Sequence, residues 1–359
     1  MAKHGEKDAT ITRLLGVELP LVQAPMAGAQ GSALAIAVGR AGGLGSLPAA
    51  MLSPDALRTE LNALRAAGVA YNVNFFTHIP PAPDAAGSVR WLEALAPYYA
   101  EHGIDPTTVP SGPGRTPFSD AAADVLAEFE PGVVSFHFGL PASDLLERVR
   151  AWGAVVLSTA TTVAEAAWLA ERGADVVIAQ GLEAGGHRGH FLAPDLVGQV
   201  PTLELVRAVV ADLGEGLPVL AAGGIADAAG VRAALAAGAS GVQVGSAFLC
   251  ADEATTSPLH RAALQAGGAT AITNVFTGRP ARGLVNRALR DIGGAADGLA
   301  LSPVAPEFPL AGVAMAPLRA AAEASGSTDF TPLWLGEGAS PRSAPAASLV
   351  ADLRRGLEF

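Results

Sequence analysis

The segment QGLEAGGHRG at residues 180–189 brings an amide, several glycines, a histidine and an arginine together. It follows the apolar run VVIA at 176–179, which indicates a buried strand. In α/β barrels and open α/β sheets, ligands bind at the carboxyl ends of the strands. Glycines at that place let backbone N–H groups approach a flat or anionic ligand closely. A Gly-rich turn with a solvated His–Arg pair is the competing interpretation, and this motif alone favours it.

Two glycine motifs further along the chain reverse that preference. PVLAAGGIAD at 218–227 indicates a strand, two glycines and a helix capped by Asp227, and GVQVGSAF at 241–248 indicates a strand that ends in Gly-Ser before a short helix. Barrels build phosphate sites after their seventh and eighth strands, where backbone N–H groups and a helix N-terminus bind the dianion. The order and spacing of the two motifs predict such a site, and Ser246 adds a hydroxyl donor.

Eight short apolar runs, separated by helical patterns, must position these loops. Alternating strands and helices imply parallel pairing with right-handed crossovers, and continuous apolar runs are typical of strands covered on both faces. We therefore expect an α/β fold, a (β/α)8 TIM barrel, with a doubly wound sheet as the competing architecture. The expected strands are Leu21–Ala24, Leu44–Leu47, Ala70–Phe75, Val133–Phe136, Val155–Ser158, Val176–Ala179, Val219–Ala222 and Gly241–Val244. The expected helices are Ser32–Ala41, Pro54–Ala67, Ser119–Phe129, Ala142–Ala151, Val163–Arg172, Leu203–Leu213, Ala228–Ala237 and a weaker one at Leu259–Gln265.

Two stretches interrupt the alternation. Residues 77–117 are rich in Pro and Gly and form an insertion after the third strand, with a helix expected near Ser88–Glu101. Residues 270–339 lack the strand–helix rhythm and are interpreted as a lid or small second domain over the barrel mouth. The chain is therefore divided into a barrel over 1–269, the lid or substrate segment over 270–339, and a segment over 340–359 whose amphipathic helix packs back on the barrel.

Composition narrows the class of protein. The net charge is −11 and no basic stripe is visible, which argues against binding to nucleic acid or to an anionic membrane. The single cysteine, Cys250, rules out a disulfide framework and a structural zinc site. No apolar run reaches the ~18 residues of a membrane span. Residues 1–8 are charged and lack the apolar region of a secretory signal, so we expect a cytoplasmic protein.

The remaining strand ends supply further candidates. The turn QAPMAG at 23–28 is stiffened by proline, and its Met26 is suited to packing on an aromatic face. Asn72 and Asn74 have the same parity in the third strand, so at least one amide should face the barrel mouth and pair with a ring N–H or C=O. A phosphate after strands seven and eight, with a planar ring lying towards Gln180, would fit one extended ligand.

Taken together, these segments resemble the nitronate monooxygenase family of FMN-dependent TIM-barrel flavoenzymes. The matching segments, in order over nearly the whole chain, are QAPMAG at 23–28, NVNFF at 72–76, SFHFG at 135–139, QGLEAGGHRG at 180–189, PVLAAGGIAD at 218–227, GASGVQVGSAFL at 238–249 and FTGRPARGLVNR at 276–287. The resemblance implies that FMN is bound by Met26, Asn74, Gln180, Gly185, Gly186, Gly223, Gly224, Gln243, Val244, Gly245 and Ser246. It also implies that His187 is the active-site histidine and that His137 is a second histidine facing the substrate.

The reaction implied by the resemblance is the oxidation of alkyl nitronates by O2 to a carbonyl compound and nitrite. His187 can donate to the nitronate oxygens or, as a neutral base, abstract the α-proton of a nitroalkane. The expected partners are a nitronate or nitroalkane and O2, with no metal, nucleic acid or membrane. A homodimer is one assembly that the sequence allows.

The chain departs from the family pattern in residues 307–319. A tyrosine and a basic or polar residue are expected there, whereas this chain has Phe308, Gly312 and Met315. The substrate face is therefore expected to be more apolar, which favours a bulkier apolar substrate.

Two other functions fit the same motifs. An FMN-dependent NAD(P)H enoyl-thioester reductase of the same superfamily would need a basic surface for a carrier protein, which Arg279, Arg282, Arg287 and Arg290 could supply. Loop anchoring is the preferred role for Arg279 and Arg282, and a loop-fixing salt bridge is the preferred role for Arg188. A non-catalytic flavin-binding protein would bind FMN and turn over neither substrate class.

Overall fold

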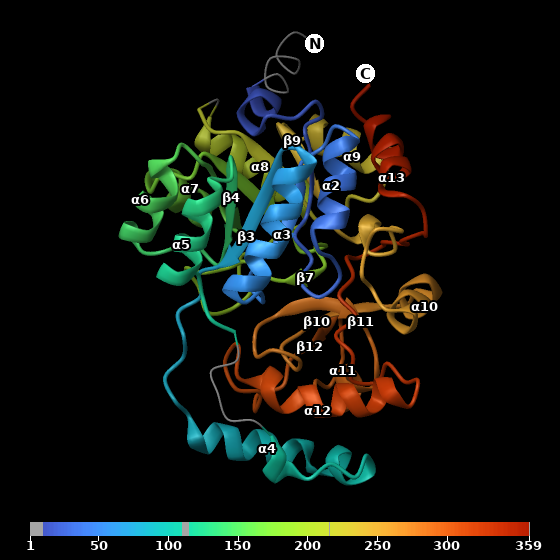
Figure 1. Cartoon of the computed structure of the whole chain (residues 1–359). Coiled ribbons are helices and arrows are strands. Elements are labelled where there is room, and N and C mark those ends of the chain that lie inside the picture. Colours follow the sequence, from blue (N-terminus) through green and yellow to red (C-terminus); the bar gives the residue numbers. More distant parts are fainter. Residues whose placement is uncertain (1–9, 110–114, 215, 359) are drawn as a thin grey trace.

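The computed structural model describes residues 10–109, 115–214 and 216–358, so the charged start at 1–8 lies outside it. Eight parallel strands with helices between them form a barrel, which confirms the expected architecture (Figure 1). The strand order is β1-β9-β8-β6-β5-β4-β3-β2, and a parallel bridge between Val22 and Leu44 joins the two end strands. The strand bounds are β1 (Leu21–Gln23), β2 (Gly45–Pro48), β3 (Tyr71–Phe76), β4 (Val133–His137), β5 (Val155–Ala160), β6 (Val176–Gln180), β8 (Val219–Ala222) and β9 (Gly241–Val244).

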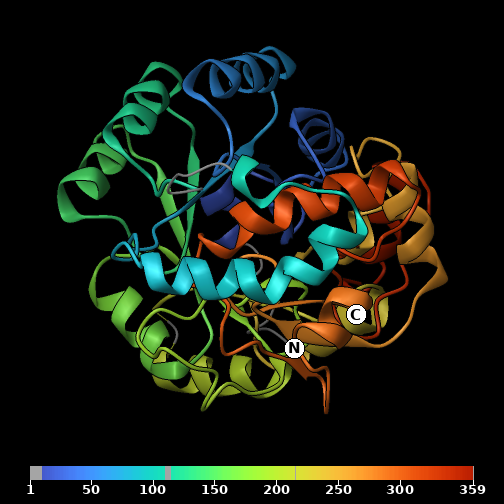
Figure 2. The same cartoon turned by 90° about the horizontal axis from the view of Figure 1, so that it is seen from below.

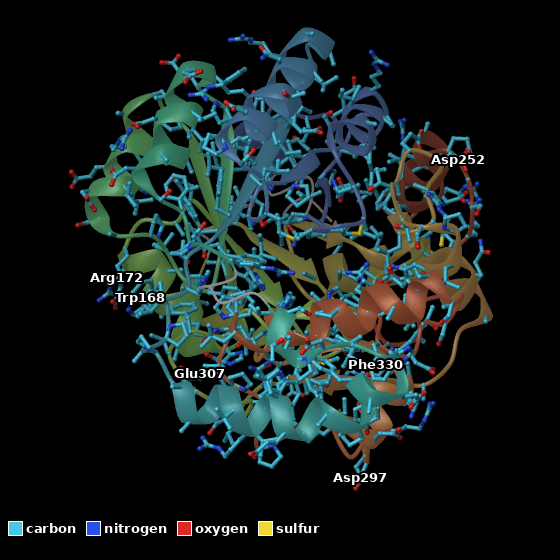
Figure 3. The ribbon with its side chains drawn as sticks, turned by 60° about the horizontal axis from the view of Figure 1, so that its bottom comes forward. Trp168, Arg172, Asp252, Asp297, Glu307 and Phe330 are labelled. Carbon is cyan, nitrogen blue, oxygen red and sulfur yellow. The ribbon has the colours of Figure 1, made fainter. Side chains whose placement is uncertain are left out.

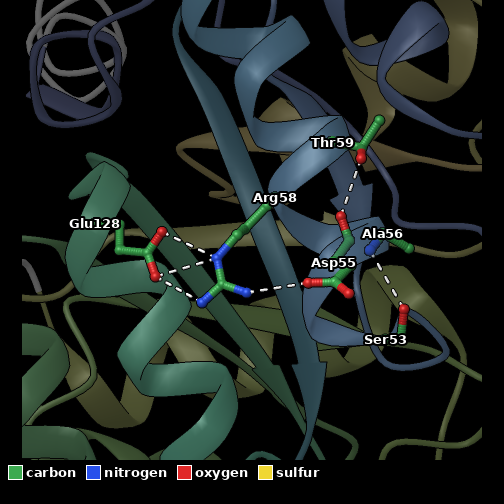
Figure 4. Close-up of polar contacts among 6 residues, drawn as sticks. All are labelled: Ser53, Asp55, Ala56, Arg58, Thr59 and Glu128. Carbon is green, nitrogen blue, oxygen red and sulfur yellow. Dashed lines mark hydrogen bonds and ion pairs between the residues drawn. The ribbon is translucent and has the colours of Figure 1, made fainter.

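Amphipathic helices surround this barrel. In α3, Leu57, Leu61 and Leu64 recur at helical spacing and are buried against the sheet, while the Ser53 side chain caps the first turn. On the solvent side Arg58 contacts Glu128 of the next barrel helix and Asp55 of its own (Figure 4). The barrel helices are α2 (Ser32–Arg40), α3 (Pro54–Ala67), α5 (Asp120–Phe129), α6 (Ser143–Ala151), α7 (Val163–Glu171), α8 (Thr202–Leu213), α9 (Ala228–Ala236) and α13 (Ala346–Arg354).

The helix expected at Leu259–Gln265 forms as α10 (Pro258–Ala266), but only its Leu264 is buried. The C-terminal helix expected to pack back on the barrel also forms, as α13 (Ala346–Arg354). Helix α13 packs against α2 and α9, and it buries Leu349, Val350 and Leu353 in the main core. The C-terminal helix therefore completes the ring because it carries the wider apolar face.

A second layer crosses the barrel mouth. It consists of α4 (Ala85–Glu101), η1 (Pro106–Thr108), α11 (Arg287–Asp291), α12 (Ala311–Ala324) and a small sheet with the order β12-β10-β11-β7. We call this layer the cover. The strands of its sheet are β7 (Gly186–His187), β10 (Thr270–Thr273), β11 (Ala281–Leu284) and β12 (Leu299–Ala300).

The cover is built from two distant parts of the chain. Helix α4, from the insertion after β3, lies alongside α12 across the mouth (Figure 2). Trp91 and Tyr99 of α4 share a hydrophobic cluster with Leu318 and Phe330 from the C-terminal part. Figure 3 shows Phe330 in this layer, whereas Trp168 lies on the outer side of the barrel. The insertion is therefore held by apolar packing, by hydrogen bonds from Trp91 and Tyr99 to carbonyls of α12, and by the ion pair between Glu101 and Arg287.

A short strand connects the barrel to the cover. Strand β7 belongs to the loop after β6, and it pairs antiparallel with β11, His187 opposite Ala281 and Gly186 opposite Arg282. The loop that contains the candidate histidine is thus one edge of the small sheet. In the described part of the chain, no helix has the length and apolar character needed to cross a membrane.

Candidate active site

A cavity of about 240 Å³ lies between the carboxyl ends of the barrel strands and the cover. It lies where ligands bind in barrels of this type. The predicted site residues that line it are Met26, Asn74, His137, Gln180, Gly185, Gly186, His187, Gly223, Gly224, Gln243, Gly245 and Ser246. These side chains and glycines come from the ends of six barrel strands, β1, β3, β4, β6, β8 and β9, and converge on one volume.

Val244 is the one predicted site residue that does not line the cavity. Successive residues of a strand point to opposite faces, so Gln243 faces the cavity while Val244 is buried in the core between sheet and helices. The Val244 carbonyl accepts a hydrogen bond of 2.8 Å from the Ala24 N–H. Its contribution is to hold the turn after β1 against β9.

A glycine cradle forms one wall of the cavity. Gly223 and Gly224 have φ angles of +121° and +65°, which L side chains rarely adopt. A Cβ on Gly223 would lie 2.7 Å from the Thr202 hydroxyl. The N–H groups of Gly223 and Gly224 make no hydrogen bond within the described residues. Such free, closely spaced donors can bind an anion such as a phosphate.

The second glycine motif completes this wall but differs from expectation. The short helix expected after β9 is a single 3-10 turn, η2 (Ser246–Phe248). A helix dipole there is therefore weak, and backbone N–H groups carry the anion-binding capacity. The Ser246 hydroxyl accepts a 2.9 Å hydrogen bond from the Gly336 N–H, which leaves its own O–H to donate.

Two amide side chains offer polar contacts to a ring. Gln243 Oε1 is buried and has no hydrogen-bond partner in the described structure, and such an orphan carries a free-energy cost unless a ligand satisfies it. Asn74 donates to Ser135 and lines the cavity, while Asn72 is completely buried beneath it. The expectation that at least one of the two asparagines faces the mouth is confirmed.

The loop over 180–189 is fixed by its own polar residues. Gln180 donates from Nε2 to the His187 carbonyl at 2.9 Å and accepts from the Gly189 N–H at 2.8 Å, so both ends of its amide are engaged. Arg188 is fully buried and donates to the carbonyl oxygens of Gln180 and Gly181 and to Gln199 Oε1. Arg188 therefore fixes the loop through carbonyl and amide oxygens instead of the expected salt bridge.

His187 Nε2 lies 2.9 Å from the Thr277 hydroxyl, which also lies 3.4 Å from the Arg279 carbonyl. Because that carbonyl can only accept, a Thr277 hydroxyl that donates to it accepts from His187 Nε2–H. Nδ1 then carries the lone pair and has no partner within the described residues. Burial, with the charge of Arg115 next in size, lowers the pKa of His187 well below its usual value. At neutral pH His187 is thus an uncharged base.

His137 is fully used within the protein. Its Nε2 donates to the His187 carbonyl at 3.2 Å, and its Nδ1 accepts from the Thr159 hydroxyl at 3.0 Å. Burial lowers its pKa to about 3. His137 lines the cavity, but it has no free ring nitrogen for proton transfer. Its geometry suits it to position the backbone of His187.

Aromatic side chains surround His187. The ring centroids of Phe76, Phe308 and Trp334 lie 6.0, 5.5 and 5.5 Å from that of the imidazole. An apolar wall of this kind excludes water and keeps the imidazole neutral. Phe308 and Trp334 come from the cover, so barrel and cover both shape the surroundings of the histidine.

Comparison with known proteins confirms the family that the sequence resembles. A sequence profile described as nitronate monooxygenase matches residues 8–356. The chain belongs to the nitronate monooxygenase family. It is 42% identical to nitronate monooxygenase from Pseudomonas aeruginosa over 347 residues, covering 95% of this chain and 97% of the relative. It is 39% identical to nitronate monooxygenase from Paraburkholderia phytofirmans, covering 96% and 94%. The protein is therefore an oxidoreductase by family.

Solved structures agree with the nitronate monooxygenase family. The structure of nitroalkane oxidase from Streptomyces ansochromogenes superposes with a TM-score of 0.85 at 39% identity and covers 97% of both chains. FabK from Thermotoga maritima gives a TM-score of 0.71 at 26% identity, covering 97% of this chain and 96% of its own. The architecture is thus shared beyond the family.

The arginines of the cover do not form a basic surface patch. Arg279 donates to the carbonyls of Arg188 and His190, and Arg282 donates to the Leu182 carbonyl and is buried. Arg287 is paired with Glu101 and Asp291. Only Arg290 of the four is exposed. Arg279 and Arg282 therefore anchor loops, as expected. The four arginines together do not form the basic surface that a carrier protein would need.

Proposed function

We propose that this nitronate monooxygenase family member uses FMN to oxidise alkyl nitronates with O2 to a carbonyl compound and nitrite. The observation that carries the proposal is the apolar cavity beside a glycine cradle with free N–H donors, which fits a flavin and a small substrate, with the neutral His187 placed to form the nitronate from a nitroalkane. The solved structure that is 39% identical to this chain is named a nitroalkane oxidase, which is consistent with this substrate class.

The residues present fit FMN. The free N–H groups of Gly223 and Gly224, with the Ser246 hydroxyl, would hold the phosphate, and the unpaired Gln243 Oε1 would accept from a ring N–H. Met26 lines the same cavity and suits packing on the ring face. When bound, the flavin supplies the electron acceptor. Glycines at 223 and 224 leave room for the approach of the phosphate.

His187 would act on the substrate carbon. Because Nε2–H is directed to Thr277, the free Nδ1 can accept the α-proton of a nitroalkane and thereby produce the nitronate in place. The same tautomer cannot donate from Nδ1 to an existing nitronate. We therefore assign His187 as the base for nitroalkanes and as one wall of the site for nitronates.

The test is nitrite release by the flavin-loaded enzyme in air, with ethyl nitronate and nitroethane as substrates. His187→Ala should retain FMN and lose most turnover of nitroethane. Unchanged kinetics would remove His187 from the mechanism. FMN binding without nitrite release, together with consumption of NADPH on addition of a crotonyl thioester, would move the assignment to the reductase. FMN binding with neither activity would indicate the non-catalytic protein.

A further inference from the structure

A second cavity adjoins the first under the cover. Its volume is about 310 Å³, and Met51, Arg115, Arg319 and Pro332 line both cavities. We call it the side cavity. The flavin site does not account for this volume, because none of the predicted cofactor-binding residues lines it.

The walls of the side cavity are mostly apolar. Helix α12 contributes Val313, Met315 and Ala316, and aromatic rings come from Phe276, Phe308 and Phe330. Gly312 of the same helix also lines the cavity. A cavity of this composition recovers free energy from apolar ligand surface, at about 0.8 kcal/mol for each buried CH2.

A cation without an ion pair stands where the two cavities meet. Arg115 is half-buried, and no carboxylate of the described residues lies within 4.0 Å of its guanidinium. Its Cζ is 6.0 Å from the ring centroids of both Phe76 and Phe308. By contrast, Arg319 is paired with Glu323 at 2.7 Å. A partly desolvated, uncompensated charge is costly, and an anionic ligand removes that cost.

The charge of Arg115 acts on the active-site histidine. After burial, the Arg115 charge is the largest electrostatic contribution to the lowered pKa of His187. The guanidinium is therefore near the reacting position as well as at the entrance to the side cavity. Since His187 is neutral, Arg115 is the cation available to an anionic substrate among the described residues that line both cavities.

We propose, on the basis of the proposed function, that the substrate is a nitronate with a long apolar chain, whose planar anion binds Arg115 and whose chain enters the side cavity. A nitronate presents two oxygens in one plane, as a carboxylate does, and the guanidinium fork matches that geometry. The reacting carbon then lies towards His187 and the chain lies along α12.

Binding can be measured without turnover. The probes are acetate, butanoate, hexanoate and octanoate, titrated calorimetrically into the flavin-loaded protein. Affinity should rise by about fourfold for each added methylene until the side cavity is filled. Arg115→Met should weaken all four carboxylates, and Arg115→Lys should restore part of the affinity. Affinity that does not depend on chain length would overturn the proposal.

A matched pair of variants on α12 tests the place of the chain. Ala316 is exposed and lines the side cavity, so Ala316→Phe should fill the cavity and abolish the gain in affinity from butanoate to octanoate. Ala320 is exposed one turn later and lines neither cavity, so Ala320→Phe should keep the wild-type series. If Ala316→Phe keeps the wild-type melting temperature and the same rise in carboxylate affinity with length, the alkyl chain of the ligand binds outside the side cavity.

Turnover separates this inference from the proposed function. Nitrite release from ethyl, butyl, hexyl and octyl nitronates should show kcat/KM rising with chain length in the wild type. Equal kcat/KM for all four would refute the chain site and leave nitronate oxidation intact. No nitrite from any of them would refute the proposed function, while the carboxylate series would still report on the side cavity.

Discussion

Removing the Thr277 hydroxyl should change which nitrogen of His187 holds the proton. In Thr277→Val the side chain keeps its shape, but the acceptor 2.9 Å from Nε2 is lost. An N–H left without a partner in this apolar site costs about 1–2 kcal/mol. The proton is then no longer held on Nε2, and the ratio of the Nε2–H tautomer to the Nδ1–H tautomer falls about 5- to 30-fold. We expect kcat/KM for nitroethane to fall by up to that factor.

The assay compares two substrates in air by nitrite release. Nitroethane requires removal of the α-proton, whereas ethyl nitronate has already lost it, so the variant should retain near wild-type kcat/KM for the nitronate. Thr277→Ser keeps the hydroxyl and should restore nitroethane turnover. An equal loss for both substrates would show that Thr277 shapes the cavity and does not set the tautomer. Full activity on nitroethane would refute the assignment of Nδ1 as the base.

Three further outcomes follow from the site. Gly223→Ala would place Cβ 2.7 Å from a threonine hydroxyl and should lower the flavin-to-protein ratio after gel filtration. Gly153→Ala, also at a positive φ (+82°) but with nothing within 4 Å of its Cβ, should keep that ratio. Burial lowers the pKa of His190 to about 4, so the unfolded chain binds a proton that the folded chain does not between pH 6.5 and 4. His190 should therefore contribute a fall in stability in urea of about 1.4 kcal/mol per pH unit on acidification through that range, and His190→Leu should reduce the measured slope by that amount. Gln180→Glu sets a carboxylate oxygen against the His187 carbonyl 2.9 Å away and should lower the melting temperature through a loss of at least about 2 kcal/mol; an unchanged melting temperature would mean that another contact holds the loop.

Much of the barrel could be predicted because its signals are local. Each strand is an apolar run. The loops that follow need residues with a positive φ, and glycine marks such positions in the sequence, as at Gly223 and Gly224. The helices at 259–265 and near the C-terminus were both expected from their periodicity, and both form. Only the tertiary packing shows that α13, which begins 88 positions after α10, is the one that completes the ring around the barrel.

The roles of single side chains at the site could not be predicted in the same way. Thr277 bonds to a histidine 90 positions away, and Arg115 lies in an insertion with no periodic pattern. His137 and Gln180 were correctly expected near the cavity, yet their polar atoms are used to hold the loop. Such assignments depend on which hydrogen bonds are already satisfied, and that is visible only when distant segments are brought together.

The pairing of β7 with β11 has a consequence for exchanging parts between relatives. His187 belongs structurally to the cover, because its two-residue strand β7 is an edge of the small sheet of the cover. A chimera that replaces 270–339 alone would separate His187 from the strand that orients it. Crossover points for recombination should therefore be chosen so that residues 186–187 and 281–282 come from the same parent. The histidine and the strand that orients it are then exchanged together.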